Sequence, residues 1–431
     1  MRAPREDFAI AICAAALAAA LASCSHRPLP FDGDGAGGVG PGSGGASGVA
    51  GAGGGAAPRG LKLIGEPRLL LDVPVTAAQL YTALLWTGDE YLFVWRSYDS
   101  AGVFMQRLDT SGQTIDGGGN MRLLNYESAV DLAWGGDRLA AVWKRRNAVA
   151  GTDLFFQAFD REARPLRDEV KLRSSTSIDI DGGITYGPRI AAIAGGFALA
   201  WYEGQVVAAT VTLDGRAQQG PEPAGGDDLA SAPTLGLAAE GDRILVSWNG
   251  WPSSSRPSAL PTAVMSTRAF TRQQLQALGG AQVLDGDGFL AGTHQVLATG
   301  NGFLALWGSD PANAAPIAVA QLDTDGVART AATMAPPIAG PYRSLAPAAW
   351  NGDHLVVLWD RSPTNENGLT LTRFGVDGVA QGPSIALPTL GPASRLCVTA
   401  HGGQDRIVGF IWSEEIPGAY EVYFQQAMAV P

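Results

Sequence analysis

The sequence contains few of the residues that staple a fold covalently or hold a metal ion. It has three cysteines and four histidines in 431 residues. Three cysteines cannot supply a disulfide framework or a four-ligand zinc site. The histidines are His26, His294, His354 and His401, and no two have the spacing of a metal-ligand pair. We therefore expect no metal and no cofactor, and the sequence identifies no catalytic residue.

Positive charge is also scarce. Lys and Arg total 30 against 41 Asp and Glu, which gives a formal net charge of −11. Nucleic-acid-binding proteins neutralise phosphates with Lys and Arg, so this balance excludes nucleic acid as a partner.

Glycine and proline, in contrast, are abundant. The 57 Gly and 27 Pro are far more than a helical protein tolerates, because both residues weaken helix interiors and both serve turns. Hydrophobic residues make up 46% of the chain, enough to bury a sizeable core. The composition predicts a globular, turn-rich protein.

The N-terminus has the pattern of an export signal. Arg2 and Arg5 precede an unbroken apolar run, residues 8–22, which is shorter than the ~20 residues that a permanent membrane-spanning helix needs. The run closes with Leu21-Ala22-Ser23-Cys24, which resembles the lipobox of bacterial lipoproteins. That resemblance implies that the Cys24 thiol is acylated and becomes the mature N-terminus, so that the lipid is the protein's contact with the membrane. An ordinary secretory signal with an incidental Cys24 is the alternative.

By the same resemblance, Ser25 lacks the Asp that signals inner-membrane retention in some lipoproteins. We therefore expect an exported protein, anchored by lipid in the bacterial cell envelope at the outer membrane. Residues 33–58 are almost wholly Gly, Ala, Ser, Val and Pro, which is typical of a flexible tether.

From residue 66 onward one phrase recurs seven times: an apolar strand, a Gly/Asp/Asn turn, and a second apolar strand that ends in Trp. The closing residues are Trp95, Trp143, Trp201, Trp248, Trp307, Trp359 and Trp412. A third strand follows, often ending in an Asp-Gly turn such as 109–112 or 323–326, and then a shorter fourth strand. Four strands in a period of about 50 residues are typical of a propeller blade.

The seventh unit has no fourth strand of its own, whereas residues 66–73 read as a spare strand before the first unit. We predict an all-β, seven-bladed β-propeller of four-stranded antiparallel blades, with its ring closed by this N-terminal strand. The repeats resemble bacterial β-propeller repeats of the kelch, Asp-box and FG-GAP kinds, a resemblance that implies an architecture and no functional residues. The expected organisation is a signal peptide at 1–23, a lipidated cysteine and tether at 24–60, and the propeller at 61–431.

The loops between the second and third strands vary in length, and so do the loops between units. In a propeller both sets lie on one face, where binding residues collect. The candidate ligand-binding residues lie on these loops: Tyr98, Asp99, Arg145, Arg146, Tyr202, Glu203, Trp251, Asp360 and Arg361. Trp251 is the one Trp outside the repeat pattern, and an exposed aromatic ring there could stack on a sugar or a partner side chain.

These observations favour an envelope lipoprotein whose propeller is a non-catalytic scaffold that binds protein or glycan. The first alternative is a carbohydrate-active enzyme, a glycoside hydrolase or lyase that uses paired loop carboxylates. The second is a structural element that docks a partner in an envelope assembly.

Overall fold

The structure of the chain is a computed structural model. It describes residues 60–74, 82–97, 102–115, 120–125, 128–147, 151–175, 187–226, 229, 233–250, 263–289, 294–308, 317–334, 347–360, 368–387, 389, 393–400, 406–416 and 419–430.

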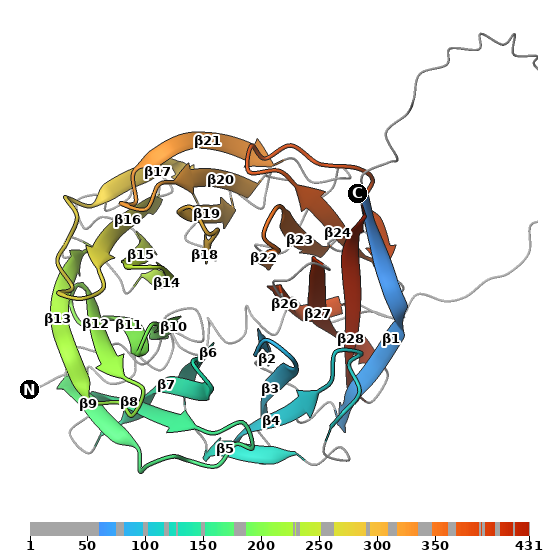
Figure 1. Ribbon diagram of the computed structural model, residues 1–431, viewed down its shortest axis with the longest axis horizontal. Coiled ribbons are helices and arrows are strands. Elements are labelled where there is room, and N and C mark those ends of the chain that lie inside the picture. The colour runs from blue at the N-terminus through green and yellow to red at the C-terminus, as the bar shows by residue number, and fades with distance from the viewer. Residues whose placement is uncertain are drawn as a thin grey trace, which may run out of the picture. The chain divides into compact units, whose positions relative to one another are not determined.

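The regular elements of the described residues are all β-strands, and they form seven sheets of four antiparallel strands each. Figure 1 shows the sheets as blades of a ring, with the first strand of each repeat innermost. The predicted seven-bladed β-propeller is therefore confirmed.

The blades follow the repeats of the sequence. Blade 1 consists of β2 (Thr82–Trp86), β3 (Tyr91–Ser97), β4 (Gly102–Leu108) and β5 (Met121–Asn125). Blade 2 consists of β6 (Ser128–Gly135), β7 (Arg138–Arg146), β8 (Thr152–Phe159) and β9 (Val170–Ser175). Blade 3 consists of β10 (Arg189–Ile193), β11 (Gly196–Tyr202), β12 (Val206–Thr212) and β13 (Ala217–Gly225). Blade 4 consists of β14 (Thr234–Glu240), β15 (Arg243–Gly250), β16 (Ala263–Thr271) and β17 (Gln282–Phe289). Blade 5 consists of β18 (His294–Ala298), β19 (Phe303–Gly308), β20 (Ile317–Leu322) and β21 (Ala328–Met334). Blade 6 consists of β22 (Ala348–Trp350), β23 (Leu355–Asp360), β24 (Leu369–Phe374) and β25 (Ile385–Leu387).

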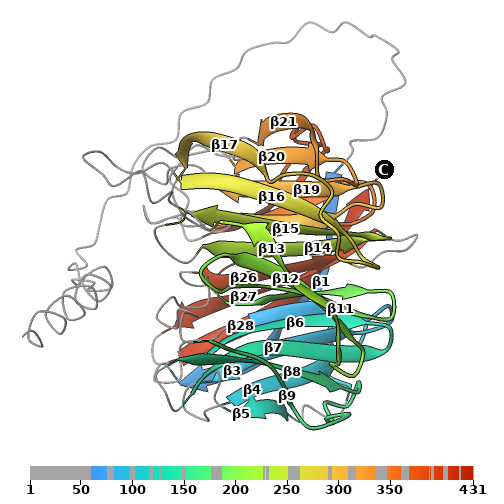
Figure 2. The ribbon, with the colours of Figure 1, turned by 90° about the vertical axis from the view of Figure 1, so that its left-hand side faces the viewer.

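Blade 7 joins the two ends of the propeller. It consists of β26 (Ala393–Ala400), β27 (Ile407–Ile416), β28 (Ala419–Val430) and β1 (Gly60–Pro74). β1 pairs with β28 in antiparallel register, from Gly60 opposite Val430 to Pro74 opposite Ala419. In Figures 1 and 2 this outermost strand lies beside the C-terminal strand, as the closure prediction requires.

The core lies between the blades. Seven clusters of buried apolar side chains each join two adjacent blades, and the cluster that contains Trp95 and Phe424 joins blade 1 to blade 7. Each closing Trp of the seven repeats is exposed by 3% or less. The recurring Trp is thus the residue that fills each interface, which explains why the repeat preserves it.

Asp side chains organise the turns between third and fourth strands. Asp109 Oδ1 accepts hydrogen bonds from the backbone N–H groups of Ser111 (2.7 Å) and Gln113 (2.9 Å). In blade 5, Asp323 repeats this arrangement and accepts hydrogen bonds from the N–H groups of Asp325 and Val327 at 2.9 Å each. These side-chain bonds take up backbone donors that a tight turn leaves unpaired.

No helix in the described part of the chain is long and apolar enough to cross a membrane.

Candidate functional site

The connections between strands separate into two faces. The connections from second to third strands span two residues (417–418) to twelve (251–262), and those between blades span two (126–127) to thirteen (176–188). They share one side of the ring, which we call the variable face. The turns from first to second strands span only two to six residues and lie on the opposite side, which we call the short-turn face. The connections from third to fourth strands lie on this face too, and they span four to twelve residues.

Several of the predicted site residues fall outside the described part of the chain. These are Tyr98, Asp99, Trp251, Arg361 and the lipidation residue Cys24. The backbone of Asp360 ends β23 on the variable face, but its side chain is likewise outside the description. For these residues the placement on a binding surface stays a prediction.

Arg145 and Arg146 end β7 instead of forming a loop with Lys144, because the strand continues through the whole basic run. Arg145 forms a bidentate ion pair with Glu169, with N–O distances of 2.5 and 2.8 Å. Its guanidinium also lies 4.3 Å from the centre of the Phe155 ring. The hydrogen bonds from Arg145 lower the pKa of Glu169. Arg145 is therefore held along the side of its blade, whereas Arg146 is exposed.

Tyr202 and Glu203 lie where β11 ends on the variable face. Glu203 accepts hydrogen bonds from Arg173 Nε (2.9 Å) and Nη2 (2.6 Å), and from Trp201 Nε1 (3.0 Å). Burial opposes ionisation of Glu203, but these bonds outweigh it and lower the pKa of the carboxyl. Because Arg173 belongs to blade 2 and Glu203 to blade 3, the pair joins two blades. Glu203 thus positions the strand ends from which the loops start.

A group that the sequence did not reveal lies at the starts of the innermost strands. Asp131 on β6 accepts a hydrogen bond from the backbone N–H of Ile190 (2.9 Å), and Arg189 Nε donates to the carbonyl oxygen of Leu235 (2.7 Å). Burial raises the pKa of Asp131 against the opposing charge of Arg189. Polar side chains therefore tie blades 2, 3 and 4 together beside the central opening.

A serine lies next to a histidine where blades 4 and 5 meet. Ser247 Oγ lies 2.8 Å from His294 Nε2, and Thr234 Oγ1 lies 3.1 Å from His294 Nδ1. Thr234 donates its own proton to Asn249 Oδ1, so Nδ1 of the neutral imidazole carries the hydrogen and Nε2 accepts from Ser247. This is the order of atoms that a nucleophilic serine would need.

The environment of this pair does not suit catalysis. Ser247 has no exposed surface and His294 is 7% exposed. Burial and the charge of Arg189 lower the pKa of His294 to about 3, whereas a general base works best with a pKa near the operating pH. We interpret Ser247, His294 and Thr234 as a satisfied hydrogen-bond cluster that joins blades 4 and 5.

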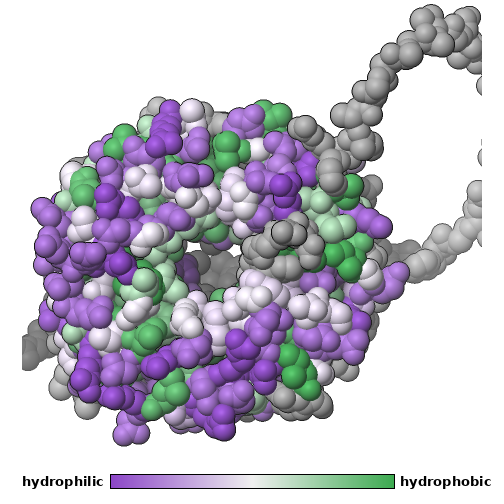
Figure 3. Space-filling view, in the orientation of Figure 1, coloured by the Kyte–Doolittle hydropathy of each residue, from purple (hydrophilic) through white to green (hydrophobic). Residues whose placement is uncertain are grey.

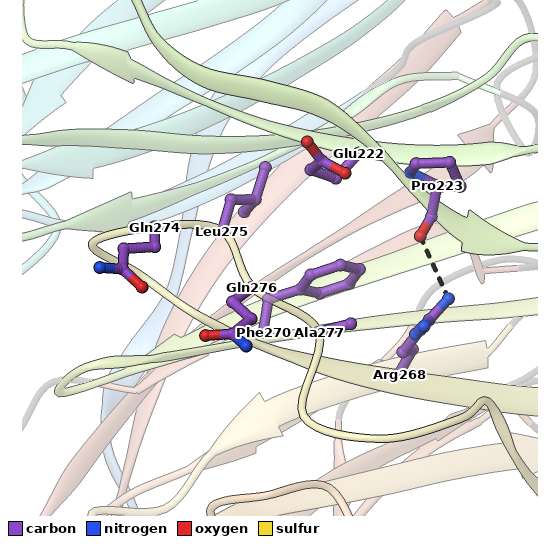
Figure 4. A pocket seen from close by; sticks show the side chains of 8 residues that line it. All are labelled: Glu222, Pro223, Arg268, Phe270, Gln274, Leu275, Gln276 and Ala277. Carbon is purple, nitrogen blue, oxygen red and sulfur yellow. Dashed lines mark hydrogen bonds between the residues drawn. The ribbon is translucent and has the colours of Figure 1, made fainter.

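An open groove of about 630 Å³ lies between β13 and β16, towards the outer rim. Figure 4 shows Phe270 and Leu275 at its floor and Arg268 at one end. Arg268 donates to the carbonyl oxygens of Pro223 (3.2 Å), Ala224 (3.3 Å) and Gly279 (3.1 Å). Because its guanidinium is already used to join blades 3 and 4, the groove offers no unused cation.

Figure 3 shows a hollow at the centre of one face and predominantly hydrophilic residues around the outer rim. No cluster of three or more His, Cys, Asp or Glu able to hold a metal ion occurs among the described residues.

No family model matches the chain, and no curated protein matches it. Solved structures are similar to it at low identity. A subtype N10 neuraminidase-like protein of A/little yellow-shouldered bat is 10% identical, with a TM-score of 0.42, over 84% of this chain and 98% of that one. The β-propeller domain of the Trilobed protease from Pyrococcus furiosus is 9% identical, with a TM-score of 0.46, over 80% and 95%.

A chain from a study of two prolyl endopeptidases is 15% identical, with a TM-score of 0.46, over 78% of this chain and 46% of that one. Likeness at this level says nothing about activity. The class of protein is defined by the chain itself: seven four-stranded blades closed by an N-terminal strand make it a seven-bladed β-propeller.

Proposed function

We propose that the protein is an exported, lipid-anchored scaffold whose propeller binds protein or glycan on the variable face without catalysis. One observation carries the proposal. Connections of two to thirteen residues, including every link from one blade to the next, gather on one side of a closed ring, whereas the first-to-second turns of the other side span only two to six. Rigid repeats that carry loops of diverse length are a common arrangement for binding.

The ion pairs at the strand ends support this proposal. Arg173 and Glu203 join neighbouring blades, and Arg145 with Glu169 fixes the end of β7. A loop that starts from fixed strand ends loses less conformational entropy when it binds, so preorganised bases favour affinity. These residues would therefore support ligand contacts made by their neighbours, including Arg146 and the predicted residues on the longer loops.

A glycan array probed with the detergent-purified full chain tests the glycan half of the proposal, and crosslinking in the native envelope tests the protein half. We expect the Trp251→Ala variant to bind its ligand about fivefold more weakly or worse, since stacked aromatic contacts in binding sites contribute on the order of 1 kcal/mol or more. The matched control is Arg164→Ala, because the Arg164 side chain is 72% exposed on the opposite face. Equal loss in both variants would contradict the proposed face, and release of new reducing ends from a bound glycan would establish the hydrolase alternative.

Anchoring through Cys24 is part of the proposal and has its own test. Cells that express the protein and take up labelled palmitate are expected to label the wild type and a Cys397→Ser control, but not Cys24→Ser. Fractionation of the envelope should then place the labelled protein with outer-membrane markers. Labelling that persists in Cys24→Ser would show that the lipobox resemblance is incidental.

A further inference from the structure

Four exposed aliphatic residues lie on the short-turn face, each in a different blade. They belong to the connections from third to fourth strands in blades 1, 2, 5 and 6. The four are Ile115, Leu166, Val327 and Val379, which are exposed by 41%, 41%, 47% and 60%. Figure 3 views this face and shows hydrophobic residues, in green, at intervals around the ring among hydrophilic ones. Apolar side chains thus meet solvent at points spread around the ring, and a flat, extended surface can contact them together.

The backbone holds these side chains at two repeated positions. The N–H groups of Ile115 and Leu166 each donate to a carbonyl oxygen near the end of the third strand, at 2.9 Å. The carbonyl oxygens of Val327 and Val379 each accept a hydrogen bond from the residue that begins the turn, at 3.0 and 2.9 Å. Equivalent positions in the blades of a propeller lie at the same height on the ring. The four side chains therefore stand close to one plane.

The chain enters the ring on this same face. Gly60, the first residue of β1, stands opposite Val430, the last residue of β28. β28 is the third strand of blade 7, and third strands end on the short-turn face. The lipid proposed on Cys24 is therefore joined to the ring at the short-turn face.

The length of the joining segment restricts how the ring faces a membrane. Residues 25–59 are 35 residues, and their Gly-rich composition predicts an end-to-end span of about 30–35 Å. A blade strand of eight residues, such as β8, is about 26 Å long. The short-turn face can rest on the membrane without stretching the segment. Turning the variable face to the membrane would instead require the segment to extend past the whole thickness of the ring.

A recess on this face combines aliphatic and charged groups, as a phospholipid surface does. It has a volume of about 490 Å³ and lies between blades 2 and 3. Leu166 and Leu213 line it together with Arg138 and Arg167. Each arginine pairs with an aspartate, at 3.4 and 3.0 Å. Attraction to an anionic surface requires an excess of Lys and Arg, so these balanced charges suit a zwitterionic headgroup better.

We propose that the short-turn face lies against a membrane surface of zwitterionic phospholipid. The inference rests on the proposed anchoring through Cys24, because the anchor holds the ring beside that membrane. The aliphatic side chains enter the boundary between headgroups and acyl chains, while the arginines of the same face extend to the phosphates. The variable face then points away from the membrane, where a ligand can reach its loops.

Spin labels on the chain anchored in vesicles of phosphatidylcholine and phosphatidylethanolamine test the proposal. Each label is attached to one introduced cysteine, Val327→Cys or Val379→Cys, in a Cys397→Ala background. The matched control is Leu69→Cys, since Leu69 is 52% exposed but pairs with Tyr423 in the middle of β1, on the outer side of the ring. We expect the two face labels to collide with a water-soluble nickel chelate about threefold less often than the control label, because an inserted apolar face lies roughly 5–10 Å deep.

A triple variant tests whether the aliphatic side chains hold the face on the lipid. With the label at Val379→Cys, the changes Ile115→Ser, Leu166→Ser and Val327→Ser together should raise its nickel accessibility to that of the Leu69→Cys label. All of these changes affect exposed side chains, so the thermal midpoint should stay within a few degrees of the wild type.

The control for the triple variant is Leu69→Ser with Val283→Ser, since both residues are exposed, at 52% and 64%, along outer strands. It should leave the Val379→Cys label protected. Failure of the chain to float with the vesicles would refute the anchoring through Cys24, and this proposal with it. A chain that floats would refute the proposed membrane-facing side alone if its face labels are as accessible as the control label, or if a label at Arg146→Cys on the variable face is protected in their place.

Discussion

At the residue scale, buried and half-buried polar side chains join blades. Glu203, Asp131 and His294 each contact a residue of a neighbouring blade or strand that is distant in sequence. The sequence predicts Glu203 on the variable face but does not reveal its partner Arg173, because that contact depends on how two blades pack. The cluster around His294 is not evident from the sequence, because its serine and threonine come from separate strands.

His294 predicts a specific dependence of stability on pH. Its pKa is about 3 in the folded state, below the 6.5 expected when unfolded, so the unfolded state binds the extra proton between these values. The stability that neutral His294 contributes is complete above pH 6.5 and is lost as the pH falls towards 3. Between pH 7.5 and pH 5 this loss amounts to about 2 kcal/mol.

Chemical unfolding of the wild type and of His294→Gln over this pH range measures the effect. The variant should have a flatter pH profile between pH 7.5 and 5, while His26→Gln, which precedes the first strand in sequence, should keep the wild-type profile. Asp131, whose raised pKa acts in the opposite direction, is present in all three proteins and cancels in the comparison. Parallel profiles for His294→Gln and the wild type would show that His294 is not buried in its neutral form.

At the scale of the elements, the sequence predicts a hairpin turn where an Asp is followed by Gly, and it misses the turns that lack this pair. Blade 2 has the same turn with Ala163 at the left-handed position, at φ 60°. Asp160 accepts hydrogen bonds from the N–H groups of Glu162 and Arg164, which stabilise the turn without glycine. The side-chain cap, more than the glycine, is thus the common feature, and a pattern that requires Gly overlooks it.

Gly112 shows where glycine is required for a second reason. It lies at φ 79°, and a Cβ atom there would be 2.2 Å from Cδ1 of Phe424 in blade 7. Gly195 has a similar φ of 81° but open space around it. Gly195→Ala should therefore cost about 1–2 kcal/mol from backbone strain alone. Gly112→Ala should cost about 1–3 kcal/mol more, because the methyl group overpacks the interface that closes the ring.

Urea unfolding of the two variants under identical conditions gives this difference. A further Gly112→Ala, Phe424→Leu double variant should recover part of the extra loss, since the smaller side chain leaves room for the methyl group. Equal losses in the two single variants would mean that blades 1 and 7 do not pack as the structure has them.

At the scale of the whole molecule, arginines join the blades on the short-turn face. Arg161 reaches Asp89 between blades 1 and 2, Arg243 reaches Asp325 between blades 4 and 5, and Arg406 reaches Asp353 between blades 6 and 7. The repeat period and the missing fourth strand were sufficient to predict the number of blades and their closure. The contacts between blades were not predictable, because each arginine occupies a different position in its repeat.

The central claim is that the ligand binds on the variable face and not on the short-turn face. Hydrogen–deuterium exchange of the full chain tests this claim most directly. The chain is compared alone and with the protein or glycan partner found by array or crosslinking. Added protection is expected to be confined to the connections of the variable face, including 251–262, while the first-to-second turns exchange as before. Protection centred on those short turns, with the variable connections unchanged, would contradict it.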